Sequence, residues 1–240
     1  MRTIIVTILA FLVAASVQAK TLIVYYSYTY NVERIVDALR TQIDADVLEI
    51  EPAEKGLDYA ANNYAIGSAQ IAAIRNNPDD AASYPAIDPI DVNLSDYDCI
   101  IVGVPLWWSN MAAPLQTFLL HYGKEMDGKK IGLIVSSASS GISGVEADAK
   151  RLIPGGDFLT PSLWIKSSQT SNAGSMLDNW LTKIDYDRLS SGISHISTDP
   201  DERYTVYSLS GVRLLSDVRS TTGLSTGIYI INGNKTIISK

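Results

Sequence analysis

The 240-residue sequence predicts an α/β fold in which helices cover both faces of a parallel sheet. From residue 20 to about residue 187, short runs rich in Val, Ile and aromatic residues alternate with segments whose apolar residues recur at helical spacing. The run 99–104 is apolar throughout, as is usual for a strand buried on both faces of a parallel sheet. It is therefore expected to be the central strand.

The first half of this region predicts two strands and two helices. A strand is expected at residues 22–26, and a helix follows it from about Asn31. Residues 44–50 alternate between apolar and polar over much of their length, which is typical of a strand near the edge of a sheet. The Ala-rich residues 56–76 should be mostly helical, and the three prolines within 77–93 indicate an extended surface segment.

The second half repeats the alternation. Pro114 suits the first turn of a helix with an apolar face. The next strand is expected at 130–135, and the helix after it should stop at Pro154 and the two glycines that follow. Residues 162–165 are expected to form the fifth strand, and Asn172 is expected to cap the last helix.

Residues 1–19 have the three parts of a secretory signal peptide: a positive charge at Arg2, an apolar run over 4–15, and small residues before a cleavage site after Ala19. The apolar run is too short for a membrane span. The mature chain is therefore expected to start at Lys20, to have no membrane span, and to be exported to the periplasm, the cell surface or the medium.

The acidic composition limits the classes of partner. The formal net charge is −7, and the mature chain, with 18 basic and 26 acidic residues, carries −8. Because the sequence has no basic cluster, nucleic acids and anionic membrane surfaces are not expected partners. His121 and His195 lack the spacing of metal ligands, so no metal site is expected. Cys99, the single cysteine, lies in an apolar run and should be a small buried hydrophobic residue.

Three predicted strand ends carry polar or aromatic loops. Residues 27–31 are dense in hydroxyl and amide groups before a helix, which suits a phosphate because the first helical N–H groups have no partner within the helix. Such residues also cap helices that bind nothing. Trp107 and Trp108 follow the central strand, where they either plug the core or form a wall beside a planar ligand. Carboxyl ends of parallel strands meet at one edge of the sheet, so a common crevice is expected.

These three loops resemble the cofactor-binding loops of the flavodoxin family. The first is similar to the family pattern S-x-T-G-N-T, which wraps the terminal phosphate of FMN, although Tyr30 stands in place of Gly and Val32 in place of the last Thr. The resemblance implies a three-layer sandwich with a five-stranded parallel sheet of order 2-1-3-4-5, and FMN as the cofactor. The phosphate-binding residues it implies are Ser27, Tyr28, Thr29, Tyr30, Asn31 and Val32.

The other two loops complete this implied site. The motif P-x-W-W-x-x-x-x-x-P is similar to the family's loop beside the isoalloxazine ring, with Ser109 where Gly often stands. Its implied binding residues are Pro105, Leu106, Trp107, Trp108, Ser109 and Asn110. The loop after residue 135 is similar to a T-S-G-G-S-G turn that borders the ring and the ribityl chain. Its implied binding residues are Ser136, Ser137, Ala138, Ser139 and Gly141.

The C-terminal region predicts a small β unit. The family resemblance ends near residue 184, so the FMN-binding domain is placed at 20–188, a polar linker at 189–202 and an all-β appendage at 203–240. Asn232-Gly233 is expected to form a hairpin turn. The appendage resembles the C-terminal sorting domain of type IX secretion cargo in Bacteroidetes; an appendage without sorting function is the alternative.

Three functions remain open from the sequence. The leading hypothesis is an exported flavodoxin-like protein that binds FMN and passes electrons to an unknown redox partner, for which an acidic surface suits a basic protein. The second is an FMN-dependent NAD(P)H:quinone-type oxidoreductase, although no residue identifies a nicotinamide site. The third is a flavodoxin-shaped binding module that has lost FMN. The residues identify no acid–base pair and do not decide between carrier and enzyme.

Overall fold

The computed structural model describes residues 19–139, 141–190, 193–194, 203–221 and 223–238 of the chain. Within them the chain divides into two compact units, Ala19–Asp187 and Arg188–Lys240. The expected signal peptide, up to residue 18, and most of the expected linker lie outside the described residues. In the described ranges, no helix combines the length and the apolar character needed to cross a membrane.

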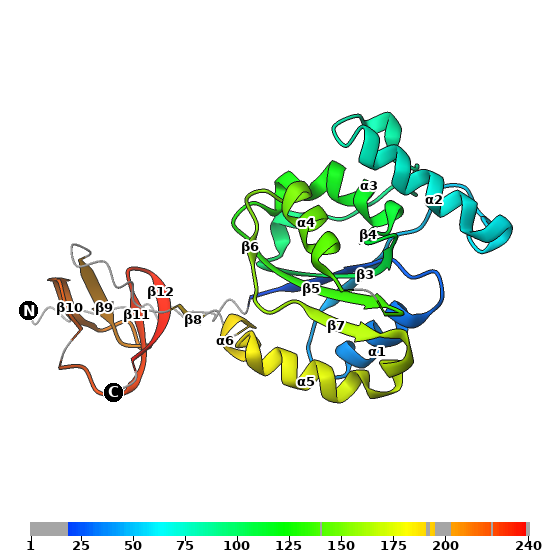
Figure 1. Cartoon of the computed structure of the whole chain (residues 1–240). Coiled ribbons are helices and arrows are strands. Elements are labelled where there is room, and N and C mark those ends of the chain that lie inside the picture. The colour runs from blue at the N-terminus through cyan, green and yellow to red at the C-terminus, as the bar shows by residue number, and fades with distance from the viewer. Residues whose placement is uncertain (1–18, 140, 191–192, 195–202, 222, 239–240) are drawn as a thin grey trace, which may run out of the picture. The chain divides into compact units, whose positions relative to one another are not determined.

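The first unit contains a parallel sheet whose strand order is β2-β1-β3-β5, followed by β6 and β7, which both pair with β5 (Figure 1). The predicted order 2-1-3-4-5 is confirmed: β5 is the predicted fourth strand, and β6 and β7 together take the place of the fifth. β2 lies at the edge and β3 in the centre. The strands are β1 (Thr21–Tyr25), β2 (Asp46–Glu49), β3 (Cys99–Trp107), β5 (Lys130–Ser137), β6 (Asp157–Phe158) and β7 (Leu163–Lys166).

The sheet has more strands than the five predicted. The fifth strand is divided: β6 pairs with the beginning of β5 and β7 with its end. Pro161 lies between the two pieces, and a proline has no N–H to donate to the ladder. A short strand, β4 (Asn110–Met111), adds an antiparallel pairing at the end of β3.

Helices cover both faces of this sheet (Figure 1). On one face, α1 (Asn31–Arg40) and α5 (Ala173–Lys183) bury Ile35, Leu39, Leu177 and Trp180 in a core with β1 and β3. On the other face, α3 (Ala113–Tyr122) and α4 (Ser143–Leu152) form the second core, and α2 (Ala61–Asn76) packs against α3. The remaining short helices are α6 (Tyr186–Ser190) and 3₁₀ turns at Ala81–Ser83, Leu94–Asp96, Gly123–Met126 and Ser167–Asn172.

The starts of α2 and α5 differ in part from expectation. The Ala-rich helix begins at Ala61 rather than near residue 56, and Asn62, Asn63 and Tyr64 in its first turn have left-handed dihedrals. Asn172 lies directly before α5, at the predicted cap position, but its side chain makes no capping bond, so that part of the prediction is wrong. The 3₁₀ turn before α5 runs directly into the helix, and Asn172 therefore lacks the extended backbone that lets a side chain cap a helix.

Cys99 is buried in β3, as expected. Burial raises the pKa of its thiol to about 12.

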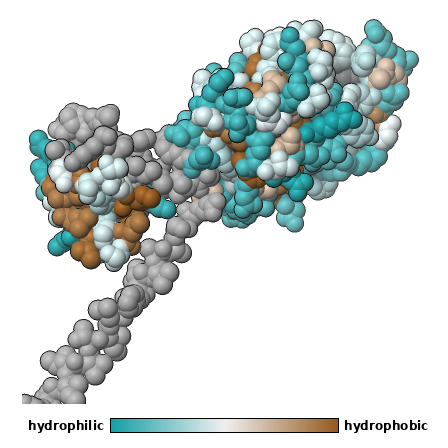
Figure 2. Space-filling view, turned by 90° about the horizontal axis from the view of Figure 1, so that it is seen from below, coloured by the Kyte–Doolittle hydropathy of each residue, from teal (hydrophilic) through white to brown (hydrophobic). Residues whose placement is uncertain are grey.

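The second unit is a sheet of order β10-β9-β11-β12-β8 with a small core of Tyr204, Val206, Ile231 and Ile238. The predicted hairpin turn is confirmed: Asn232 and Gly233, with φ of 50° and 85°, join β11 to β12. Apolar residues are visible on the surface of the second unit (Figure 2). The strands are β8 (Ile193–Ser194), β9 (Tyr204–Tyr207), β10 (Arg213–Val218), β11 (Gly227–Ile231) and β12 (Asn234–Ile238).

Candidate ligand-binding site

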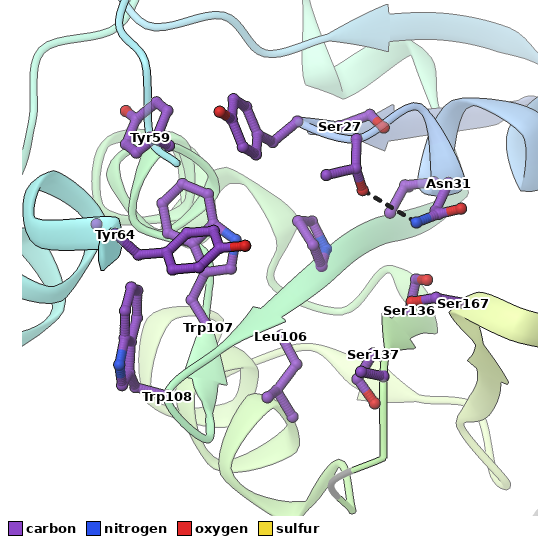
Figure 3. Close-up of a pocket in the computed structure, with 16 residues that line it drawn as sticks. Ser27, Asn31, Tyr59, Tyr64, Leu106, Trp107, Trp108, Ser136, Ser137 and Ser167 are labelled. Carbon is purple, nitrogen blue, oxygen red and sulfur yellow. Dashed lines mark hydrogen bonds between the residues drawn. The ribbon is translucent and has the colours of Figure 1, made fainter. Parts of the chain in front are cut away.

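The loops after β1, β3 and β5 meet around one pocket of about 350 Å³. Figure 3 shows hydroxyl-bearing side chains toward one side of this pocket and aromatic rings toward the other. None of its 16 lining residues has a charged side chain. They are Ser27, Tyr28, Thr29, Asn31, Val32, Tyr59, Tyr64, Gly67, Pro105, Leu106, Trp107, Trp108, Ser136, Ser137, Ala138 and Ser167.

The loop between β1 and α1 forms the polar side. The hydroxyl oxygen of Ser27 accepts a hydrogen bond from the backbone N–H of Glu33 in the first turn of α1, at 3.3 Å. The amide of Asn31 donates to the hydroxyl of Thr29 at 3.0 Å. The helix therefore starts at the pocket, with its first N–H groups and the positive end of its macrodipole at this loop. An anion is favoured at this position.

Tyr30 lies outside the lining of the pocket. Its backbone has a φ of 59°, and 65% of its surface is exposed to solvent. The left-handed conformation explains why the family pattern has Gly here, because a residue with a Cβ pays about 1 kcal/mol or more for it. The side chain points into solvent and leaves the pocket open.

The loop after β3 is a tight hairpin. Leu106 and Trp107 of β3 pair with Met111 and Asn110 of β4, so Trp108 and Ser109 are the two turn residues. Their φ values of 46° and 67° are those of a type I′ turn, in which glycine is preferred.

Trp107 is the centre of an aromatic wall. Its ring centroid lies 4.8 Å from that of Tyr59, 5.7 Å from that of Tyr26 and 6.4 Å from that of Trp108. The Tyr28 hydroxyl, beside this group, accepts a bond from the N–H of Ala60 and donates one to Asp58. Burial raises the pKa of the Tyr26 phenol, which stays neutral in this wall. The wall offers an uncharged surface to a flat ligand.

The end of β5 supplies hydroxyl groups. The Ser137 hydroxyl accepts a hydrogen bond from the indole N–H of Trp164 on β7, at 2.8 Å. The Ser136 hydroxyl is buried and has no hydrogen-bond partner within the described part of the chain. A buried polar atom without a partner destabilises a protein by about 1–3 kcal/mol. A polar ligand in the pocket would remove that penalty.

A family model described as Flavodoxin matches residues 20–184. The chain belongs to the flavodoxin family. Among solved structures, a candidate flavoprotein from Bacteroides eggerthii is 23% identical, with a TM-score of 0.56 over 70% of this chain and 98% of that one. A flavoprotein from Lactobacillus acidophilus, solved in complex with FMN, is 22% identical, with a TM-score of 0.51 over 65% of this chain and 99% of that one. These likenesses show the fold of the flavodoxin unit.

The flavodoxin unit brings together most of the residues proposed from sequence. Besides Tyr30, the predicted residues that do not line the pocket are Ser109, Asn110, Ser139 and Gly141. The Asn110 side chain instead donates to Asp148 of α4 at 2.9 Å. Ser139 and Gly141 lie exposed beyond the end of β5.

Sequence reasoning missed four residues that line the pocket: Tyr59, Tyr64, Gly67 and Ser167. Ser167 directly follows β7, so the rule that hydroxyls after strand ends meet at one edge could have identified it. The other three come from α2 and the segment before it. No local pattern marks that segment as facing the crevice.

Proposed function

We propose that this flavodoxin-family chain binds FMN in the pocket and transfers electrons. The observation that carries the proposal is that one uncharged pocket combines the N-terminus of α1 at its polar side with an aromatic wall at the other. The L. acidophilus structure, which contains FMN, supports the same ligand. When bound, FMN supplies one- and two-electron redox chemistry.

The residues present fit the parts of FMN. The N-terminus of α1, with Ser27 and Thr29, offers hydrogen-bond donors for a phosphate group without a cationic side chain. Trp107 and Trp108 would exclude water from one side of the planar ring system. Ser136, whose buried hydroxyl has no partner in the described chain, has a free donor for a polar atom of the ligand.

The departures from the family pattern are compatible with FMN. Tyr30 and Ser109 both adopt the positive φ that glycine would adopt, so the two loops keep their shape. This argues against the alternative that the fold has lost its cofactor.

Electron transfer is proposed over NAD(P)H-dependent catalysis. A net charge of −8 for the mature chain suits docking with a basic redox protein, and the pocket lining has no cationic side chain for the pyrophosphate of a nicotinamide dinucleotide. Anaerobic addition of NADPH or NADH to the FMN-loaded protein distinguishes the two. A carrier keeps its flavin absorbance, whereas an oxidoreductase is bleached.

We also propose that residues 1–19 direct export and that the second unit is a sorting domain. Edman sequencing of protein recovered from the cell surface or the medium should begin at Lys20. Recovery only from the cytoplasm, with Met1 intact, would contradict export. Loss of surface delivery on deletion of 203–240 tests the sorting role.

The phosphate site is tested by Ser27→Ala combined with Thr29→Ala. Hydrogen bonds to a charged group contribute about 1.5–3 kcal/mol each, so the loss of two should lower FMN affinity by about a hundredfold or more. Riboflavin, which lacks the phosphate, should bind the variant as it binds the parent. Thr41→Ala is the matched control, since Thr41 bonds the Ala38 carbonyl at the far end of α1. An equal loss for FMN and riboflavin would contradict this assignment.

A further inference from the structure

We propose that Arg75, which lies outside the pocket, is a positioning residue that joins α2 to the β3–β4 hairpin and holds the aromatic wall in its binding geometry. The inference rests on the proposed function for its effect on FMN. The joining of the two elements can be tested without FMN.

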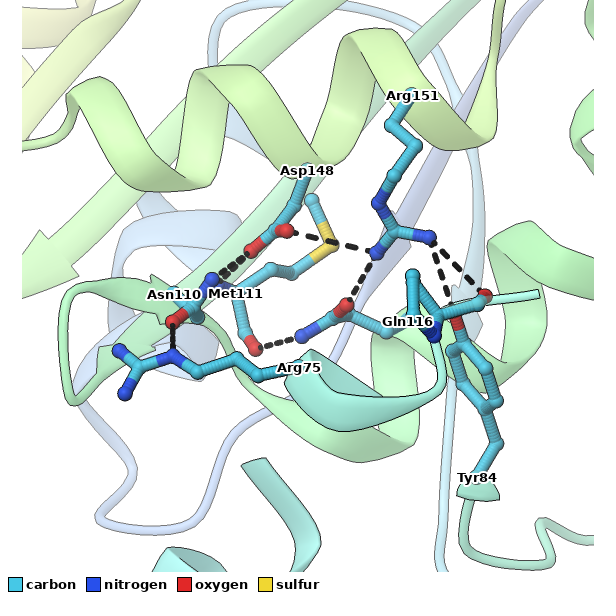
Figure 4. A network of polar contacts seen from close by, with 8 residues as sticks. Arg75, Tyr84, Asn110, Met111, Gln116, Asp148 and Arg151 are labelled. Atoms are coloured by element: carbon cyan, nitrogen blue, oxygen red, sulfur yellow. Dashed lines mark hydrogen bonds and ion pairs between the residues drawn. The ribbon is translucent and has the colours of Figure 1, made fainter. Parts of the chain in front are cut away.

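The contacts place Arg75 across the hairpin turn. Arg75 is in the last turn of α2, and its Nε donates to the side-chain oxygen of Asn110 at 2.6 Å. A second guanidinium nitrogen donates to the backbone carbonyl of Trp108. On the opposite side, the buried Asp148 of α4 accepts from the Asn110 amide and from the N–H of Met111, both at 2.9 Å (Figure 4). The turn is held between the two helices.

The hairpin needs this support because its turn residues are unfavourable for its conformation. Trp108 and Ser109 both have left-handed backbones, which cost free energy in residues with a Cβ. Both residues are exposed, and 40% of the Trp108 surface faces solvent, so they are not fixed by full burial in the core. The planar guanidinium donates to two acceptors of the hairpin at once, the Asn110 side chain and the Trp108 carbonyl, which fixes the hairpin in a way that a single charge does not.

Arg75 also joins the tryptophans of the hairpin to α2, a helix that lines the same pocket. The same helix, α2, carries Tyr64 and Gly67, which line the pocket. A Cβ built on Gly67 would lie 3.0 Å from the Trp108 ring, so this ring packs closely on α2. Arg75 lies at the other end of α2 and holds the backbone of the same tryptophan. The aromatic side of the pocket, where Tyr64 of α2 lies with Trp107 and Trp108 of the hairpin, therefore depends on the joining of helix and hairpin.

FMN affinity is proportional to the fraction of molecules in which the aromatic wall is in place. A loosened hairpin reduces that fraction and therefore lowers the affinity. Loss of hydrogen bonds from a charged donor at an exposed site predicts about fivefold to tenfold weaker binding in Arg75→Ala. Arg75→Lys should recover part of the loss, since one ammonium replaces one of the two contacts. Ser109→Gly, added to Arg75→Ala, should recover affinity because glycine favours the left-handed turn.

The experiment uses the full mature chain and two readouts. Near-ultraviolet circular dichroism of the FMN-free protein reports the packing of its four tryptophans, of which Trp107 and Trp108 lie beside the Arg75 contacts. Fluorescence titration with FMN reports affinity. Arg40→Ala is the matched control: Arg40 is also an exposed arginine in the last turn of a helix, α1. We expect Arg75→Ala to change the tryptophan signal and the affinity, and Arg40→Ala to change neither.

Two results would overturn the inference. One is an unchanged tryptophan signal in Arg75→Ala. The other is a loss of unfolding free energy with FMN affinity intact, which would make Arg75 merely structural. Failure of the parent protein to bind FMN would instead refute the proposed function, and the tryptophan signal would still decide whether Arg75 positions the hairpin.

Discussion

Gly144→Ala should displace the β3–β4 hairpin, which carries Trp107 and Trp108, directly. Gly144 is in the first turn of α4, and a Cβ built on it would lie 1.8 Å from the carbonyl oxygen of Ser109. Real Cβ contacts under 3.0 Å essentially do not occur, so this distance must open to at least that value. The next residue, Val145, and Ala149 anchor α4 in the core with no exposed surface. The exposed hairpin should therefore move, and the helix should not.

The magnitude follows from the clash. Forcing an extra carbon into a packed site costs about 1–3 kcal/mol of unfolding free energy. For a unit of this size each kcal/mol lowers Tm by about 2–4 °C. Movement of the aromatic wall should also weaken FMN binding by about tenfold, the equivalent of about 1.4 kcal/mol.

Gly123→Ala is a control with the same kind of clash elsewhere. A Cβ on Gly123 would lie 1.9 Å from the carbonyl oxygen of Leu152, and neither residue lines the pocket. Urea unfolding should show a similar loss of stability in the two variants, whereas FMN titration should show weaker binding only in Gly144→Ala. Normal FMN affinity in Gly144→Ala, or an equal loss in Gly123→Ala, would refute the reasoning.

Three further predictions concern single residues. Ser136→Ala removes a buried hydroxyl that has no partner in the described chain, so it should raise the unfolding free energy of the FMN-free protein by up to about 1 kcal/mol. The same variant should bind FMN more weakly. A loss of stability without a change in affinity would contradict the assigned role. Because burial raises the pKa of Cys99 to about 12, its thiolate is scarce below that pH, and a thiol reagent at pH 8 should label it in urea and not in the native protein. Tyr30→Gly should stabilise the protein by about 0.5 kcal/mol in urea unfolding, because Tyr30 has a left-handed backbone that glycine adopts without a Cβ clash. FMN affinity should stay unchanged, because the Tyr30 side chain is exposed. Weaker binding would show that its ring contacts the ligand.

The parts of the site that were predictable from sequence lie where strands end. Short apolar runs located β1, β3 and β5, and the geometry of parallel sheets places the loops after them at one edge. The start of α1 at Asn31 was likewise visible in the spacing of its apolar residues. These features depend on local periodicity, which a single sequence carries.

The parts that were not predictable depend on contacts distant in sequence. Tyr64, which lines the pocket, lies in a left-handed first turn of α2, a conformation that residues with a Cβ disfavour and that helical periodicity does not predict. Asn110, expected at the ligand, instead bonds Arg75 and Asp148, each more than 30 residues away. The division of the fifth strand at Pro161 is the exception, because the proline was visible in the sequence.

Binding of FMN is the claim on which the redox assignment depends, and titration of FMN with the purified mature chain tests it most directly. The account predicts that flavin fluorescence is quenched as FMN stacks on the aromatic wall, and that the quenching saturates at one FMN per chain. Heat denaturation should release the FMN and restore its fluorescence in the supernatant. Fluorescence that stays unchanged at every protein concentration would contradict it.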